Sequence, residues 1–148
     1  MQTLKLTKQD FDAQNKYIGK TDVSDYQGHI EIEGGLGWVF FVEINITGFL
    51  WAKAGSGIKA GEGIEAGWGI EAGSGIKAGE GIEAGSGIKA GEGIEAGLYI
   101  ICKLTLSSKL RIFAGLCIWK IPSEEEKTIT CKKLVQGEIA YGILKELK

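Results

Sequence analysis

The side chains of this 148-residue chain show few of the arrangements that carry out covalent chemistry. His29 is the only histidine, and any nucleophile–histidine–acid triad would have to use it. No Gly-X-Ser-X-Gly elbow surrounds a serine, and a single histidine rarely does chemistry without an orienting partner. We therefore interpret His29 as structural or simply exposed, and we expect no catalytic residue and no enzyme activity.

Metal and cofactor sites also lack their usual residue patterns. Cys102, Cys117 and Cys131 are spaced too widely for a zinc site, and their odd number does not fit a disulfide framework. They are typical of reduced, buried thiols in a cytoplasmic protein. The Gly-X-Gly segments match neither a phosphate-binding loop nor a dinucleotide fingerprint. We expect no metal and no cofactor.

A six-residue repeat dominates the chain. From Gly55 to Ala96 the motif Gly-X-Gly-Ile-[Lys/Glu]-Ala occurs seven times without a break. Six is a multiple of two, so in extended chain every repeat turns Ile and Ala to one face and Lys or Glu to the other. Two glycines per repeat disfavour a helix. Short Ile-X-Ala strands fit better, with glycine at the corners because it reaches positive φ without steric cost.

Stacked coils are needed to bury so thin an apolar face, so the repeat predicts an all-β, parallel β-solenoid. Counting in sixes extends the inward positions to Phe40, Ile46 and Ala52 on one side and to Ile118 on the other, with Val42 and Ala54 at the alanine position. The coil size stays open. Three hexads per turn would stack Glu65 on Glu83, and two would stack Glu71 on Glu83.

The segments outside the repeat are expected to form caps. We divide the chain into an N-terminal segment (1–36), the solenoid (37–120) and a C-terminal β-hairpin (121–148). A short helix is expected over Thr7–Tyr17 with Phe11 facing inward, and a strand over His29–Glu33. The hairpin would join Thr128–Leu134 and Glu138–Leu144 near Gly137, covering the last coil or pairing its edge. Bulky residues such as Trp38 and Trp51 would add apolar burial at the ends.

Charge favours a binding surface over a nucleic-acid site. The chain carries a net charge of −2, too weak for a phosphate-binding surface or a highly acidic DNA mimic. The perfect repeats are more acidic, with glutamates outnumbering lysines. In a solenoid the Lys and Glu side chains of successive repeats form rows. Such charged rows are usually only a solvent-exposed face, and the alternative is that they form a rigid, regular recognition surface. Trp68 breaks the Ser/Glu alternation at position X. Candidate partner-binding residues are Glu62, Glu65, Trp68, Glu71, Glu80 and Glu83.

The hexapeptide acyltransferases are the solenoid enzymes most worth comparing. In that family glycine typically follows the aliphatic residue, and a histidine is catalytic. Here Lys or Glu follows each isoleucine of the perfect repeats, and no histidine lies among them. Shared architecture without the site does not indicate shared function.

The repeats, together with the tail Lys109-Leu110-Arg111-Ile112-Phe113-Ala114-Gly115-Leu116-Cys117-Ile118-Trp119, resemble glycine-rich hexapeptide-repeat proteins of phage and mobile elements in Firmicutes. Some of these resemble anti-CRISPR proteins. The resemblance implies inhibition of a Cas effector nuclease complex by direct binding, and it carries over no catalytic residue.

Two functions therefore remain as hypotheses. The first is a non-enzymatic binding protein that occludes a host CRISPR-Cas effector. The second is a self-associating structural solenoid, such as a fibre or tail component. The expected partner is a protein, with a homodimer possible. No direct nucleic-acid binding and no membrane association are expected, since Met1–Asp10 is polar and no apolar run approaches about 18 residues.

Overall fold

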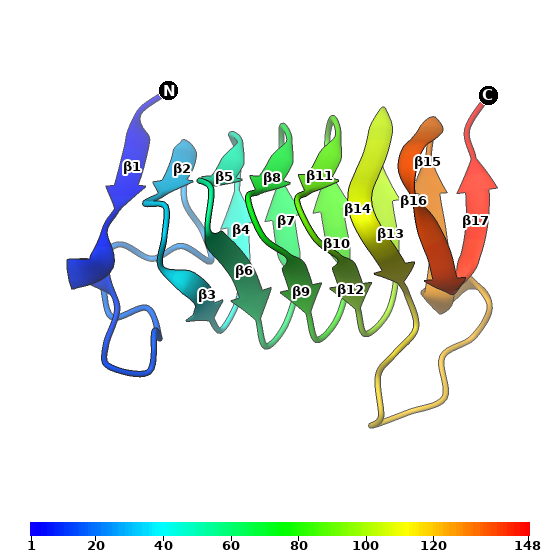
Figure 1. Ribbon diagram of the computed structural model, residues 1–148, viewed down its shortest axis with the longest axis horizontal. Coiled ribbons are helices and arrows are strands. Elements are labelled where there is room, and N and C mark those ends of the chain that lie inside the picture. Colours follow the sequence, from blue (N-terminus) through cyan, green and yellow to red (C-terminus); the bar gives the residue numbers. More distant parts are fainter.

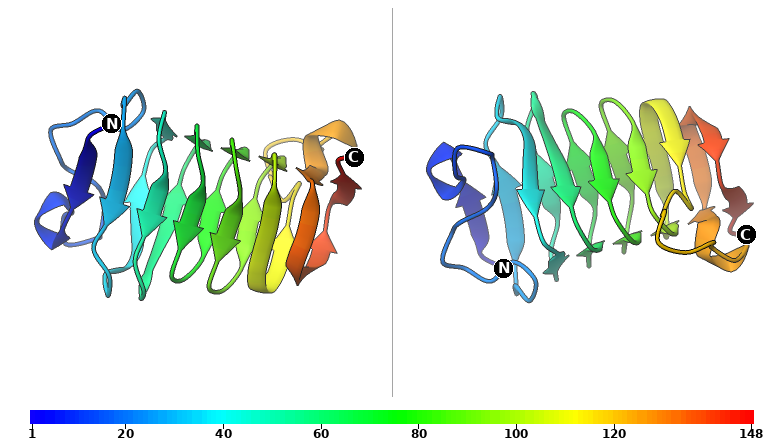
Figure 2. Two further views of the ribbon diagram at one scale, coloured as in Figure 1. Left: turned by 90° about the horizontal axis from the view of Figure 1, so that it is seen from above. Right: turned by 90° about the horizontal axis from the view of Figure 1, so that it is seen from below.

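The computed structural model describes residues 1–148 as one stack of parallel β-coils. The chain makes about six turns, and its two ends lie at opposite ends of the stack (Figure 1). Views from two further sides show the same regular stacking of coils (Figure 2). The predicted all-β parallel solenoid is confirmed.

Each coil contains three hexads. Ile64 pairs with Ile82, and Ile82 pairs with Ile100, so residues 18 positions apart lie one above the other. This register decides between the two coil sizes and stacks Glu65 on Glu83. Every hexad turns one corner and forms one short strand, so each coil is a triangle.

The three faces are built from the following strands. Face 1 contains β3 (Gly37–Phe41), β6 (Ser56–Ala60), β9 (Ile76–Ala78) and β12 (Ile94–Ala96). Face 2 contains β4 (Ile44–Ile46), β7 (Ile64–Ala66), β10 (Ile82–Ala84), β13 (Ile100–Cys102), β15 (Thr128–Cys131) and β17 (Ile143–Glu146). Face 3 contains β1 (Thr3–Leu6), β2 (His29–Ile32), β5 (Leu50–Ala52), β8 (Ile70–Ala72) and β11 (Ile88–Ala90).

Two longer strands turn a corner and join faces 3 and 1. β14 (Thr105–Phe113) pairs with β11 through its first half and with β12 through its second. β16 (Lys133–Tyr141) pairs with β14 along both halves. The parallel ladders thus include β1 and β2 before residue 37 and β15 to β17 after residue 120.

The core is a column of isoleucines with alanines beside it. Every isoleucine and every alanine of the seven repeats is buried, and the residue between them faces outward. Cys102 and Ser108 take the alanine position in later coils and are fully buried there. The predicted inward positions of the perfect repeats are therefore confirmed.

Before the perfect repeats, counting in sixes gives the wrong register. The residues stacked under the isoleucines are Val39, Ile44 and Leu50, while Val42 and Ala54 are exposed. Ile46 and Ala52 do face inward, but at the alanine position. The cause is a change in corner length: a turn at Ala54-Gly55, with φ of +83° at Gly55, lengthens one corner.

After the perfect repeats the period holds as far as Ala114 and then ends. The chain leaves the coil at Gly115, where φ is +83°, and Ile118 is 100% exposed rather than inward.

The expected C-terminal hairpin is wrong in form. β15, β16 and β17 pair in parallel with β13, β14 and β15, so they continue the coil and pair its edge. Gly137 lies inside β16, at its corner, because the strand bends there instead of reversing.

The N-terminal segment covers one end of the stack. Instead of the expected helix over Thr7–Tyr17, the chain forms a single 3-10 turn at Lys8–Asp10, where the Thr7 amide donates to Asp10 Oδ2 over 2.8 Å. Phe11 is buried, as expected, and packs edge-on against Phe41 with ring centroids 5.8 Å apart. The other bulky residues do not act as core caps, since Trp38 and Trp51 are exposed on the outer faces.

Glycine serves this fold mainly through close approach between coils. Of the repeat glycines only Gly55 has positive φ. The expectation that the corner glycines are needed for positive φ is therefore wrong for the others. A Cβ on Gly85 would instead overlap the carbonyl oxygen of Gly67 in the preceding coil.

The structure contains no helix long and apolar enough to cross a membrane.

Candidate protein-binding surface

Four of the predicted partner-binding residues lie together on face 2. Glu65 and Glu83 are direct neighbours at the centres of β7 and β10. Glu62 and Glu80 precede them at the corner, where the Glu80 amide donates to the Glu62 carbonyl oxygen over 3.2 Å. The Gly-Glu-Gly-Ile-Glu-Ala hexads at 61 and 79 are three hexads apart, so a three-hexad coil necessarily stacks them.

These carboxylates surround one aromatic ring. Glu43 joins the four, and the five line a shallow cleft of about 170 Å³ together with Tyr99. Tyr99 lies over Gly81, which has no side chain to displace the ring. Burial raises the pKa of the Tyr99 phenol, and the neighbouring carboxylates Glu83, Glu65 and Glu80 raise it further. We call Glu43, Glu62, Glu65, Glu80, Glu83 and Tyr99 the acidic cluster.

No cation of the chain neutralises this cluster. The ion pairs of the molecule lie elsewhere: Lys53–Glu31, Lys77–Glu95, Arg111–Glu138 and Lys120–Glu126. Glu62 and Glu65 are exposed, and Glu80 and Glu83 are half-buried. No group of three or more His, Cys, Asp or Glu side chains is arranged to hold a metal ion. The cluster is thus an uncompensated negative patch on a rigid sheet.

An apolar loop leaves the solenoid at the corner row of the acidic cluster. Leu98 lies one coil beyond Glu80 at this corner, and its amide donates to the Glu80 carbonyl oxygen. The Gly115 amide in turn donates to the Leu98 carbonyl oxygen over 2.8 Å. Beyond this point Ile118 and Ile121 are almost fully exposed, and Trp119 is 60% exposed. We call residues 116–122 the apolar loop. Sequence reasoning missed it because Ile118 falls on the hexad count.

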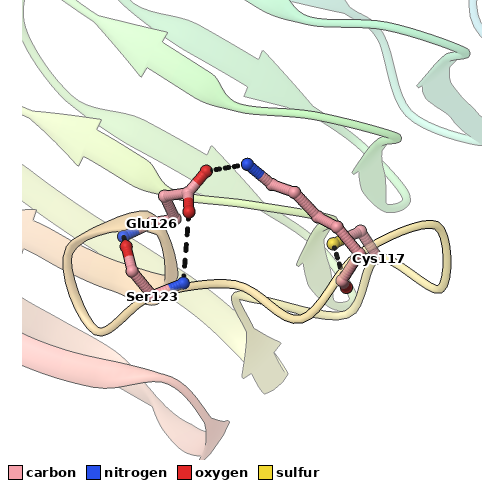
Figure 3. Close-up of polar contacts among 4 residues, drawn as sticks. Cys117, Ser123 and Glu126 are labelled. Atoms are coloured by element: carbon pink, nitrogen blue, oxygen red, sulfur yellow. Dashed lines mark hydrogen bonds and ion pairs between the residues drawn. The ribbon is translucent and has the colours of Figure 1, made fainter.

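Polar contacts hold the base of the apolar loop in shape. Figure 3 shows the ion pair between Lys120 and Glu126 and the Ser123 amide donating to Glu126 Oε1 over 3.1 Å. Cys117 Sγ donates to the Lys120 carbonyl oxygen over 3.3 Å. The contact with Lys120, followed by that with the Ser123 amide, lowers the pKa of the Glu126 carboxyl. The loop therefore presents its apolar side chains from an organised turn.

Trp68 and Glu71 do not belong to this surface. Trp68 lies at the corner between faces 2 and 3, is 51% exposed, and packs edge-on against His29 with ring centroids 4.7 Å apart. Glu71 lies on face 3 between Trp51 and Lys89. His29 is buried, and its Nδ1 accepts a hydrogen bond from the Phe49 amide over 3.0 Å. This supports a structural role for His29.

Comparison of the chain with protein-family models, with curated proteins and with solved structures finds no match. The geometry of the surface therefore carries the functional argument.

Proposed function

We propose that this chain is a non-enzymatic binding protein that uses the acidic cluster and the apolar loop to bind a basic protein surface. The observation that carries the proposal is the uncompensated row of carboxylates on face 2. Exposed like charges directly opposite one another in a sheet are destabilising. A ligand with cationic groups would relieve this repulsion and gain affinity from it.

The geometry also supports one kind of partner over others. Coils repeat at about 4.8 Å, so the carboxylates form a short, rigid, regular array. Arginine and lysine rows that bind nucleic-acid backbones carry complementary charge. The exposed isoleucines and tryptophan of the apolar loop supply the aromatic and aliphatic contacts that typically anchor an interface. A nuclease complex with a basic groove fits both features.

Within that class, we propose a CRISPR-Cas effector as the partner and occlusion of its nucleic-acid groove as the mode of inhibition. Support for this finer proposal comes from the resemblance of the repeats to anti-CRISPR proteins. The charge of the acidic cluster is consistent with it.

The test is a pull-down of purified Cas effector complexes with the tagged chain. We expect one effector to be retained in stoichiometric amount and released by rising salt, because exposed charges are screened. The variant Glu80→Lys/Glu83→Lys should lose the effector. Its matched control is Glu92→Lys/Glu95→Lys, which changes the same repeat positions by the same charge on a different face.

Equal loss of binding in both variants would remove the acidic cluster from the proposal. If both variants still retain the effector, the apolar loop would be the remaining contact. The variants Trp119→Ala and Ile121→Ala would then test it. No retained effector would exclude the tested complexes as partners.

Open-ended assembly into a fibre has less support. Such stacking needs an open N-terminal end, whereas residues 7–28 pair with two of the three strand edges there through Lys16↔Phe40 and Tyr26↔Ile46.

A further inference from the structure

Each face of the triangular coil carries a row of glycines on its outer surface. The third residue of every perfect hexad comes directly before the inward isoleucine, so a side chain there would point outward. Because glycine has no side chain, each row forms a groove along the solenoid. The rows are Gly57, Gly75 and Gly93 on face 1, Gly63 and Gly81 on face 2, and Gly69 and Gly87 on face 3.

On faces 1 and 2 an aromatic ring of the chain lies in this groove. A Cβ on Gly57 would be 3.0 Å from Trp38 Cε3, and one on Gly75 would be 2.7 Å from Trp38 Cη2, so the indole covers both glycines. On face 2, a Cβ on Gly81 would overlap the Tyr99 ring. All three covered glycines are buried. The grooves of this solenoid therefore accept an indole or a phenol ring.

Face 3 has the same groove, but the residue before it turns its ring away. Phe49 holds on face 3 the row position that Trp38 holds on face 1. Its ring stacks instead on His29 of the preceding coil, with ring centroids 4.2 Å apart. A Cβ on Gly69 would meet only the Gly87 carbonyl oxygen, at 3.2 Å. No ring of the chain covers Gly69.

The residue after the groove is too small to fill it. Thr105 holds on face 3 the position that Tyr99 holds on face 2. Its side chain approaches Gly87 through the hydroxyl, since a Cβ on Gly87 would lie 2.9 Å from Thr105 Oγ1. Gly69 and Gly87 are half-buried, unlike the glycines under the two rings. A hollow of about 520 Å³ remains over them, with Trp51 along its side.

Two unpaired charges also line this hollow. Glu71 and Lys89 are direct neighbours in β8 and β11. Both are exposed, and the ion pairs of the molecule include neither. A carboxylate accepts hydrogen bonds and an ammonium group donates them. Side by side, they complement the backbone N–H and C=O groups that flank an aromatic residue in a polypeptide.

We propose that the hollow over Gly69 and Gly87 binds a tryptophan or tyrosine side chain of a protein partner. We call it the face 3 slot. The bound ring would take the place that Trp38 and Tyr99 take on the other faces, and such rings bury a large apolar area with a polar group at one end. The slot lies on a different face from the acidic cluster, so either surface can bind without the other.

NMR titration of the labelled protein with the tripeptide Gly-Trp-Gly, blocked at both ends, tests the slot. The amide signals of Gly69 and Gly87 should shift and saturate, and blocked Gly-Leu-Gly should leave them unchanged. Thr105→Tyr should abolish the response, because it supplies the ring that Tyr99 supplies on face 2. Thr105→Ser is its matched control and should bind like the wild type. Thr105 is exposed, so neither change disturbs the core.

A second pair of variants changes the floor of the groove. Gly69→Ala adds a methyl group inside the slot and should weaken binding about two- to tenfold, as loss of one aromatic contact does. Gly63→Ala adds the same group at the same hexad position on face 2, where a Cβ would lie 3.4 Å from the Gly81 carbonyl oxygen. It should leave peptide binding unchanged. Circular dichroism shows whether each variant keeps the β-fold.

Several results would overturn the face 3 slot as a protein-binding site. Unchanged Gly69 and Gly87 signals at millimolar peptide would do so, as would equal binding of Gly-Leu-Gly. A response that survives in both Thr105→Tyr and folded Gly69→Ala would place the peptide elsewhere. Free indole that binds as tightly as the tripeptide would make the slot a small-molecule site and remove the protein partner.

Discussion

At the scale of single residues, the first glycine of the hexads, except at Gly61, lies so close to the coil before it that a side chain would collide with that coil. A Cβ on Gly85 would overlap the carbonyl oxygen of Gly67, whereas a Cβ on Gly61 would lie 3.7 Å from Val42 O, an ordinary contact. We expect Gly85→Ala to destabilise the fold by about 1–3 kcal/mol, as overpacking does. Gly61→Ala should be neutral or stabilising by up to about 1 kcal/mol. Urea unfolding of both variants measures the difference, and equal effects would contradict the explanation.

The buried thiol of Cys102 makes a prediction about pH. Burial raises its pKa from the ordinary 9.0 to about 12, with Cys131 adding to the effect. Between these values the folded chain keeps the proton and the unfolded chain loses it, so the free energy of unfolding falls as pH rises. Cys102→Ala places the usual repeat residue there and should reduce this fall, seen as a smaller drop in Tm from pH 8 to pH 10.5.

Cys117 provides the control for that titration. It is only half-buried and lies in the loop rather than the core, so Cys117→Ala should leave the alkaline fall in Tm as it is in the wild type. An unchanged fall in Cys102→Ala as well would show that other groups dominate the alkaline range.

At the scale of elements, one buried serine joins the N-terminal segment to the solenoid. Ser56 Oγ donates to Glu33 O over 2.5 Å and accepts from the Leu36 amide over 3.1 Å. Ser56→Ala leaves both backbone groups without this partner, and should cost about 1–3 kcal/mol. Ser74 holds the same repeat position one coil later and is half-buried, so Ser74→Ala should have little effect. Thermal unfolding compares the two, and a similar Tm would contradict the proposed role of Ser56.

The elements also show what periodicity can and cannot predict. Ile/Ala alternation correctly predicts parallel strands wherever the hexad is intact, because a two-residue side-chain period fixes the inward face. Corner length is not encoded in that alternation. One longer corner at Ala54-Gly55 therefore shifted the register of Ala52 and the strands before it, and the exit at Gly115 turned Ile118 outward.

The candidate site was half predictable for the same reason. Glu62, Glu65, Glu80 and Glu83 belong to intact hexads, so their shared face follows once the coil holds three hexads. Tyr99 and the apolar loop depend on irregular segments, where a contact such as the one between Tyr99 and Gly81 is visible only in three dimensions.

At the scale of the whole molecule, the perfect repeats should be interchangeable building blocks. Each coil contacts only its neighbours, and every intact hexad offers the same Ile, Ala and glycines for stacking. Deleting the single hexad Gly73–Ala78 should therefore give a folded, slightly less stable solenoid in which the part after the deletion is rotated by one face relative to the part before it.

That deletion divides the acidic cluster without changing any of its residues. Glu80, Glu83 and Tyr99 stay together, because residues 79–102 keep their mutual register. Glu65 moves to the adjacent face and stacks on Lys89 instead of Glu83. If the intact cluster binds the partner, the deletion should lower affinity while circular dichroism and cooperative unfolding are retained. Deleting the 18 residues 67–84 should preserve the face register instead, so a loss of folding in the one-hexad deletion alone would show that the hexads are specific to their faces.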